Sequence, residues 1–220
     1  MVRRSIAPNK GFLTSSCCPA FVDYIKKHVP ELADKVSHNL SPMAQIGKLA
    51  KLGGKSPVRC IFIGSCTAKK AEMRLPSVNL WIGSVLTFEE LQAMIDAREI
   101  EMESLEETSM NDASYFGRIF GRSGGLTKAV LEVIKEKGLD FEVKAEACDG
   151  IEACKAALLK AKFDKLDKNF IEGMACVGGC VGGVASLNHE AKSRVKVDKY
   201  GKDSDKENVR QAIDTYKFSI

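Results

Sequence analysis

The chain has 220 residues, of which 45% are hydrophobic and 28% are charged, and its formal net charge is +4. This balance is typical of a folded protein with a buried core. Lysine and arginine are spread along the chain, so the sequence does not predict a nucleic-acid partner. It contains no secretory signal and no apolar run of the roughly 18 residues that a membrane helix requires. We therefore expect a cytoplasmic protein without a membrane span.

The first half of the chain predicts alternating helices and strands. Apolar residues recur at helical spacing over 20–28, and a serine-proline pair is typical of the start of a helix over 41–51. The apolar run 58–63 suits a buried strand. A capping box, Thr-Phe-Glu-Glu, predicts a helix over 87–98. The acidic stretch 99–111 is expected to be a solvated connection.

The second half continues the alternation after a glycine-rich turn at 121–125. The predicted elements are a helix at 126–137, a strand at 141–147, a helix at 151–162, a strand at 169–174 and a surface helix at 206–216. The order predicts an α/β fold with a mainly parallel sheet and flanking helices. Ligands of such sheets gather at the carboxyl ends of strands, where Cys66 and Cys176 are expected.

Eight cysteines are many for a chain of this length, and in the cytosol they indicate metal or redox chemistry more than disulfides. Cys176 and Cys180 are close enough in sequence to reach one metal centre. Cys66 and one of Cys17 or Cys18 would complete four thiolates, which suit a 4Fe–4S cluster or zinc. Zinc sites usually have two close pairs, and this chain has one, so the spacing favours a cluster. A zinc site, and reactive or buried thiols, stay as alternatives.

The three cysteine segments resemble, in the same order, the three signature motifs of iron-only (FeFe) hydrogenases. Segment 14–19 is the first motif, Thr-Ser-Cys-Cys-Pro, with one additional serine, and segment 66–72 fits the second, with Ser65 in place of a proline. The third motif is matched by Glu172, Met174, Cys176, Gly179, Cys180 and Gly183. The loop 121–125 also looks like a family element, and the resemblance covers most of residues 11–190.

The resemblance implies a set of site residues. The ligands of a 4Fe–4S cluster would be Cys18, Cys66, Cys176 and Cys180. Cys180 would also bridge to the two-iron subsite of the H-cluster, and Met174 would pack against that subsite. Cys17 would pass protons, and Lys69 would hydrogen-bond a cyanide ligand. Ser37 and Ser41 lie where the family places hydroxyls of a proton path.

The resemblance also implies a function, the reversible reduction of protons to dihydrogen. The alternative is a 4Fe–4S-binding redox or hydrogen-sensing module without turnover, possibly one half of a split enzyme. We expect a partial hydrogenase-like domain at 1–190 and a polar tail with a surface helix at 191–220. The leading part of the family's catalytic domain is expected to be missing. The implied partners are an electron carrier such as ferredoxin, maturation proteins and a chain that supplies the missing segment.

Three further expectations concern the positions and surroundings of these residues. The four ligand sulfurs should lie within about 6–7 Å of one another. A partly apolar face beside the cysteines should be exposed. The remaining cysteines should be small buried residues, and the histidines should be structural or solvated; these residues are Cys60, Cys148, Cys154, His28, His38 and His189.

Overall fold

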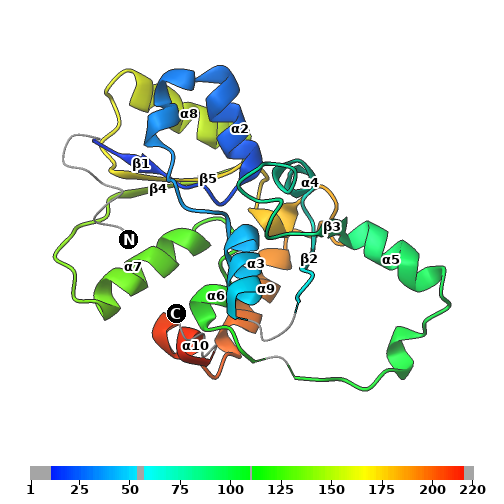
Figure 1. The fold of residues 1–220 in the computed structure, drawn as a ribbon. Helices are drawn as coiled ribbons and strands as arrows, with labels where there is room; N and C mark the ends of the chain where they lie inside the picture. The colour runs from blue at the N-terminus through cyan, green and yellow to red at the C-terminus, as the bar shows by residue number, and fades with distance from the viewer. Residues whose placement is uncertain (1–10, 54–56, 110, 216–220) are drawn as a thin grey trace.

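Two parallel sheets organise the molecule in the computed structural model, which describes residues 11–53, 57–109 and 111–215 (Figure 1). The first sheet has the order β1 (Leu13–Thr14), β5 (Phe170–Met174) and β4 (Ala145–Asp149). The second pairs β2 (Ile61–Gly64) with β3 (Ser84–Thr87). The α/β class and the parallel strands confirm the expected fold, with the strands divided between two sheets.

The three-stranded sheet is covered by helices on both faces. Figure 1 shows α2 (Pro19–His28) and α8 (Ile151–Lys162) on one face and α7 (Gly125–Glu136) on the other. All five residues of the central strand β5 are buried accordingly. Phe21 and Ile25 of α2 and Leu158 of α8 share one hydrophobic core with Ile171. This packing fixes the carboxyl ends of β1 and β5 side by side.

The two-stranded sheet has a smaller core. Helix α3 (Pro42–Gly53) packs Met43 and Ala44 against Val85, and α4 (Ala68–Glu72) and α5 (Phe88–Asp96) follow the two strands. The expectation of a buried strand was wrong for one face of β2, where Ile61 is 55% exposed and Ile63 is 41% exposed. Only alternate side chains of a strand point to one face, and here Phe62 is the one packed against the core.

The C-terminal helices pack against the middle of the chain. Gly201 of α9 (Ser193–Lys202) lies against Ile119, just after α6 (Tyr115–Arg118). Helix α10 (Val209–Thr215) donates the backbone N–H of Val209 to Glu136 of α7 at 2.7 Å. The predicted surface helix at 206–216 corresponds to α10, although residue 216 lies outside the described residues.

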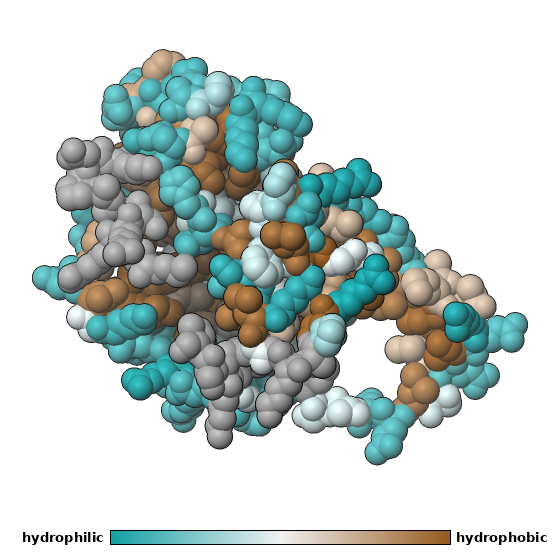
Figure 2. Space-filling model, viewed as in Figure 1, coloured by the Kyte–Doolittle hydropathy of each residue, from teal (hydrophilic) through white to brown (hydrophobic). Residues whose placement is uncertain are grey.

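The segment between α5 and α6 forms an open arm. Figure 1 shows it running away from both sheets, and its described residues form only the short 3-10 helix η2 (Met102–Ser104). Residues 99–109 are all exposed, which confirms a solvated connection for that part of the predicted stretch 99–111; residue 110 lies outside the described residues, and Asn111 is half-buried. Figure 2 shows hydrophobic side chains on this arm, and the exposed ones include Ile100, Met102 and Leu105.

The predicted helices are confirmed to within a few residues, whereas two strands, β2 and β4, begin three and four residues later than expected. Strand β4 starts at Ala145 and not at 141 because the Asn169 side chain occupies backbone groups of the preceding residues. It accepts from the Lys144 N–H and donates to the Glu142 carbonyl, each at 2.8 Å. The short elements that the sequence did not predict are β1, β3, α4, α6, α9, η1 (Pro30–Lys35), η2 and η3 (Cys180–Gly182).

No helix in the described part of the chain is both long enough and apolar enough to cross a membrane.

Candidate cysteine-rich cluster site

The three cysteine segments are joined by direct hydrogen bonds between their backbones and side chains. The Ser65 hydroxyl, next to Cys66, donates to the carbonyl of Cys180, and the Ser65 carbonyl accepts from Ala185 at 3.1 Å. The Lys69 ammonium donates to the carbonyl of Cys17 at 3.3 Å. Residues more than 100 positions apart in sequence therefore form one site. The serine that replaces the family's proline is itself one of the links.

Neighbouring strand ends bring two of the cysteines together. Strands β1 and β5 pair in parallel and end at Thr14 and Met174, so Cys18 and Cys176 follow at the same edge of the sheet. Cys66 follows β2 of the other sheet. The site thus lies where the carboxyl ends of strands from both sheets meet, as expected for a ligand site in an α/β fold.

The thiols of the site also affect one another's pKa. The pKa of Cys180 is raised to about 11, chiefly by burial and then by the nearby thiols of Cys18, Cys66 and Cys176, whereas Lys69 lowers it. Although Cys180 is exposed as a residue, the surrounding protein withdraws water from its thiol. The pKa of Cys176 is raised by burial and then by Cys18 and Cys66. Like charges raise one another's thiol pKa only when they are close.

Cys17, unlike the four proposed ligands, has a hydrogen bond with the Ser15 side chain. Burial raises its pKa to about 12, opposed by a hydrogen bond from Ser15 and reinforced by Cys18 and Cys180. Ser15 is held in place because its hydroxyl also accepts from the backbone N–H of Gly173 at 3.0 Å. Cys17 is therefore a protonated thiol at neutral pH, next to the other cysteines.

Lys69 forms a buried ion pair with Glu72, a residue to which the sequence did not assign a role. Their side chains are 7% and 8% exposed, and the Nζ–Oε2 distance is 2.6 Å. The residues stand three apart on α4, so the helix itself brings them together. That spacing is visible in the sequence, but only burial distinguishes this pair from surface pairs such as Lys155 and Glu152.

A cavity of about 800 Å³, lined by both polar and apolar residues, extends from the surface to Glu72. Its lining includes Ser37 and Ser41, the two hydroxyls expected near a proton path, together with Asp23 and Lys26 of α2. Ser37 and Ser41 are both buried, at 8% and 2% exposed. The structure thus brings these two serines and Glu72 to one cavity.

Glycines let the loop around Cys180 approach its neighbours. Gly179 has a φ of +76°, and a Cβ there would lie 2.6 Å from the Ser123 nitrogen and 2.7 Å from the Gly121 oxygen. The Cys180 N–H donates to that same Gly121 oxygen at 2.6 Å. The glycine-rich turn 121–125 therefore supports the third motif directly, and a side chain at 179 would push it away.

Glu172 of the third motif has a structural role that the sequence did not reveal. It is fully buried, and its carboxylate accepts from the backbone N–H groups of Gly124 and Thr127 at 2.9 and 2.8 Å and from the Thr127 hydroxyl at 2.6 Å. These groups form the first turn of α7, where an anion compensates unpaired N–H groups and the helix dipole. A long-range cap of this kind leaves no local pattern.

The other predicted site residue, Met174, is 2% exposed at the end of β5. Its carbonyl accepts from the N–H of Gly150 at 2.9 Å. No contact of its side chain distinguishes a cofactor role from core packing, so its role stays a prediction.

The described residues contain no group of three or more histidine, cysteine, aspartate or glutamate side chains placed to hold a single metal ion. The four thiols thus do not surround one point, as the ligands of a tetrahedral zinc would. A polynuclear cluster distributes its thiolates over several irons and tolerates a wider arrangement. The separations between the four sulfurs remain a prediction.

The remaining cysteines and histidines mostly follow the expectation. Cys148 and Cys154 are buried, whereas Cys60 is only half-buried, with its thiol 3.7 Å from the Gly47 oxygen. All three histidines are exposed, as expected for solvated residues: His28, His38 and His189.

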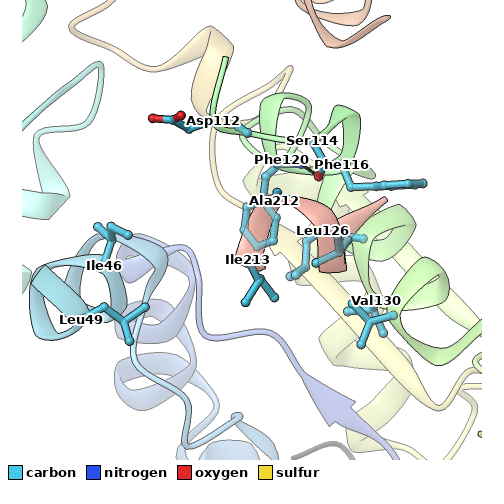
Figure 3. A pocket seen from close by; sticks show the side chains of 15 residues that line it. Ile46, Leu49, Asp112, Ser114, Phe116, Phe120, Leu126, Val130, Ala212 and Ile213 are labelled. Carbon is cyan, nitrogen blue, oxygen red and sulfur yellow. Dashed lines mark hydrogen bonds between the residues drawn. The ribbon is translucent and has the colours of Figure 1, made fainter. Parts of the chain in front are cut away.

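A second cavity, of about 590 Å³, is apolar and is lined by other residues than the first (Figure 3). Figure 3 shows Ile46 and Leu49 of α3 across the space from Ile213 of α10 and Leu126 of α7. Asp112 and Ser114 are the polar side chains among the described residues that line it, and none of those residues is a cysteine. We therefore do not assign it to the cysteine-rich site.

Comparison with known proteins gives the family context. Residues 2–184 match the family described as "Iron only hydrogenase large subunit, C-terminal domain". The chain is 28% identical to Iron hydrogenase 1 of Clostridium pasteurianum over 84% of the chain and 39% of that relative. It is 29% identical to the periplasmic Fe hydrogenase large subunit of Nitratidesulfovibrio vulgaris over 83% of the chain and 53% of that relative. The chain thus spans about half or less of these relatives.

Solved structures of FeFe hydrogenases share the fold. One, described in a study of stepwise H-cluster assembly, superposes with a TM-score of 0.71 at 17% identity and covers 98% of this chain and 74% of the other. An FeFe hydrogenase variant from Chlamydomonas reinhardtii gives a TM-score of 0.69 at 18% identity, with the same coverage.

Proposed function

Because the chain belongs to the family formed by the C-terminal domains of the large subunits of iron-only hydrogenases, we propose that it binds a 4Fe–4S cluster and contributes to the reversible reduction of protons to dihydrogen. The proposed ligands are Cys18, Cys66, Cys176 and Cys180. The observation that carries the proposal is that three cysteine segments distant in the sequence lie next to one another, linked by hydrogen bonds of Ser65 and Lys69.

The donor set suits an iron–sulfur group. Four thiols and no competing carboxylate ligand are supplied by strand-end loops, and thiolates are the ligands that iron–sulfur clusters take. Glycines at 178, 179 and 183 keep the third motif free of bulk. When bound, such a cluster with its two-iron subsite supplies low-potential electrons and an iron centre for hydrogen chemistry.

Cys17 is proposed to hold and release the proton that the reaction consumes. Burial raises its pKa to about 12, so the thiol holds a proton at neutral pH. Ser15 fixes its orientation through a hydrogen bond. Cys17 is therefore assigned to proton transfer and not to the ligand set.

Lys69 is proposed to bind an anionic ligand of the two-iron subsite. A lysine ammonium has three donors, and within the described residues two of them are directed to Glu72 and to the Cys17 carbonyl. The third is left for a ligand on the Cys17 side. The pairing with Glu72 fixes the ammonium and limits the side-chain freedom that binding would otherwise remove.

The cavity lined in part by Ser37, Ser41 and Glu72 is proposed as the route by which protons reach Cys17 from solvent. Hydroxyls and a carboxylate can pass protons along a chain that includes water. The route passes Lys69, because Glu72 is paired with it and Lys69 contacts the carbonyl of Cys17.

The full reaction is proposed to require further protein. The chain spans 37–53% of the curated relatives, and exposed apolar side chains flank the site at Val177, 75% exposed, and Val184, 65% exposed. We propose that a partner segment covers this face, that maturation proteins insert the two-iron subsite and that a ferredoxin-like carrier exchanges electrons. Dihydrogen evolution by the chain alone, at the rate of a complete hydrogenase, would refute the need for a partner segment.

Anaerobic reconstitution with iron and sulfide tests the cluster proposal. We expect about four irons and four sulfides per chain and loss of both when Cys66 is replaced by alanine. A matched Cys60→Ala variant, which also removes a half-buried thiol, should retain both. Zinc bound in preference to iron, or equal iron in the two variants, would contradict the proposal.

A redox or hydrogen-sensing module without turnover is the second candidate. The observation that favours it is Ser65, which stands where the hydrogenase motif has proline and ties the second motif to the Cys180 carbonyl. Loading with a synthetic two-iron subsite, followed by infrared spectroscopy and a dihydrogen assay, separates the two. Carbonyl and cyanide bands without dihydrogen production would favour the sensor.

A further inference from the structure

Ser65 links the second cysteine motif to the third through a buried hydroxyl. It lies between the end of β2 at Gly64 and Cys66, and it is only 7% exposed. A buried hydroxyl requires a hydrogen-bond partner, and that of Ser65 donates to the carbonyl of Cys180, which is 115 positions away in the sequence. Proline, which the resembled motif has at this position, has no hydroxyl and could not make this contact.

The same serine contacts the far end of the loop that begins at Cys180. The Ser65 carbonyl accepts from the backbone N–H of Ala185 at 3.1 Å. The carbonyl of Cys180 also accepts from the N–H of Gly183 at 3.0 Å, which closes the 3-10 helix η3. A 3-10 turn of this length has little stability of its own. The loop 180–185 therefore depends on contacts from outside it, and Ser65 contacts both of its ends.

The loop packs against Ser65 without space for a side chain. Gly183 is buried, and a Cβ there would lie 2.4 Å from the Ser65 hydroxyl oxygen and 2.6 Å from its carbonyl oxygen. Both separations are shorter than a Cβ contact allows. The last glycine of the third motif thus permits the close approach on which the hydrogen bonds of Ser65 depend.

Cys180 is fixed through both of its backbone groups, by two different parts of the chain. Its N–H donates to the Gly121 oxygen at 2.6 Å, in the turn before α7, and its carbonyl accepts from Ser65. These contacts set the direction of the Cα–Cβ bond and hence the position of the thiol. Without the Ser65 hydroxyl, Cys180 would be held only from the Gly121 side and by η3.

We propose that Ser65 is a positioning residue, which holds the loop 180–185 so that Cys180 presents its thiol to the cluster before the cluster binds. The consequence for the cluster rests on the proposed function, whereas the holding of the loop does not. Ligands that are already in place lose less conformational freedom on binding. The contacts of Ser65 should therefore slow the release of a bound cluster.

The held loop also carries a donor for a second ligand. Val184 lies between Gly183 and Ala185, whose N–H groups are both hydrogen-bonded. The backbone N–H of Val184 lowers the pKa of the Cys176 thiol through a hydrogen bond. Hydrogen bonds to ligand sulfurs stabilise the more negative, reduced state of a cluster and so raise its reduction potential. Loosening this loop should therefore lower the potential.

Hydrogen exchange of the metal-free chain tests whether Ser65 holds the loop. In Ser65→Ala, the backbone N–H groups of Gly183 and Ala185 should exchange roughly two- to tenfold faster than in the wild type, the effect of losing one hydrogen bond. Ser186→Ala is the matched control, because that hydroxyl donates to the nearby Asn188 carbonyl at 3.1 Å. It should leave both rates unchanged. Equal rates in Ser65→Ala and the wild type would overturn the proposal.

The wild-type chain gives a check that needs no variant. The N–H of Ala185, which donates to Ser65, should exchange more slowly than the N–H of Leu187, a residue that is 59% exposed. Similar rates for these two groups would also overturn the proposal.

Reconstitution with iron and sulfide tests the positioning of Cys180. In Ser65→Ala, a chelator should remove the iron roughly two- to tenfold faster than from the wild type. The midpoint potential of the cluster, from a redox titration followed by electron paramagnetic resonance, should move to a more negative value. Ser186→Ala should match the wild type in both measurements. Unchanged release and potential in Ser65→Ala would mean that Ser65 does not position Cys180.

The two proposals can fail separately. A wild-type chain that takes up no cluster would refute the proposed function, and with it the role of Ser65 in positioning a ligand. The exchange rates of the metal-free chain would still show whether Ser65 holds the loop 180–185.

Discussion

The adjacent cysteines of the first motif, Cys17 and Cys18, have different surroundings. Replacing each should therefore change a different property of the protein, either its iron content or its dihydrogen turnover. We expect Cys18→Ala to lose most of the bound iron after reconstitution, because one of four thiolates is removed. Cys17→Ala should retain iron and lose dihydrogen turnover in the matured protein, because a proton donor is lost and the ligands are not. Iron analysis and a hydrogen assay check this. Equal iron loss in both variants would contradict the separate roles.

The raised thiol pKa of Cys17 should make the metal-free chain sensitive to alkaline pH. Its pKa rises from 9.0 to about 12 on folding, so between these values the unfolded chain loses a proton that the folded chain keeps. The free energy of unfolding should therefore fall as pH rises through this window and should be unaffected by this group below pH 9.

Urea unfolding of the metal-free chain at pH 8 and pH 10.5 measures this effect. Cys17→Ser, which has no group that titrates in this window, should show a smaller loss of stability between the two pH values. An identical loss in the variant and the wild type would show that Cys17 does not contribute.

At the scale of elements, two adjacent glycines offer a matched test of the third-motif loop. Gly178 and Gly179 both have positive φ, +83° and +76°, so alanine strains the backbone at either position by about 1–2 kcal/mol. Only at Gly179 would the new Cβ also meet backbone atoms, at 2.6 and 2.7 Å; at Gly178 the nearest atom is 3.7 Å away. We expect Gly179→Ala to cost about 1–3 kcal/mol more.

Thermal or urea unfolding compares the two glycine variants, and iron binding reports on Cys180. Gly178→Ala should retain more iron than Gly179→Ala, because only the latter displaces the loop from Gly121. The reverse order would mean that backbone strain, and not the close approach, controls this loop.

The carboxylate of Glu172 on β5, which caps α7, should contribute measurably to the free energy of unfolding. Glu172→Gln keeps the shape of the side chain but replaces charge-assisted hydrogen bonds with neutral ones. We expect a loss of about 1–3 kcal/mol in the free energy of unfolding. Glu152→Gln, an exposed residue in the first turn of α8, is the matched control and should change stability by about 0.5 kcal/mol or less. Equal effects would contradict the capping role.

At the scale of the whole molecule, the residues after 190 are held by contacts that a loose tail would not make. Arg122, with 3% of its side chain exposed, pairs with Asp198 of α9 at 2.6 Å. Asp198→Asn should lower the free energy of unfolding by about 2 kcal/mol, less than the 3–5 kcal/mol of a fully buried pair because Asp198 is partly exposed.

Asp203→Asn, at the exposed end of the same helix, is the control for the Asp198 variant and should have little effect. Truncation after residue 190 should destabilise the chain more than Asp198→Asn, because it also uncovers Ile119, against which Gly201 packs. A truncated chain as stable as the full one would support the predicted division into a domain at 1–190 and a polar tail at 191–220.

The sequence by itself determined the features that depend on neighbours in the chain. The capping box at Thr87 is present with both of its hydrogen bonds, at 3.1 and 2.8 Å, because Thr87 and Glu90 stand three residues apart. The helices and the three cysteine motifs could be identified for the same reason: periodicity and spacing record local geometry.

Only the tertiary structure decided which distant side chains meet. The division into two sheets, the cap that Glu172 gives to α7 and the ion pair of Arg122 with Asp198 depend on burial and on strand pairing. Burial and strand pairing between distant segments produce no fixed residue spacing that could be recognised in the sequence. The free energy that brings such residues together comes from the packing of whole elements around a core.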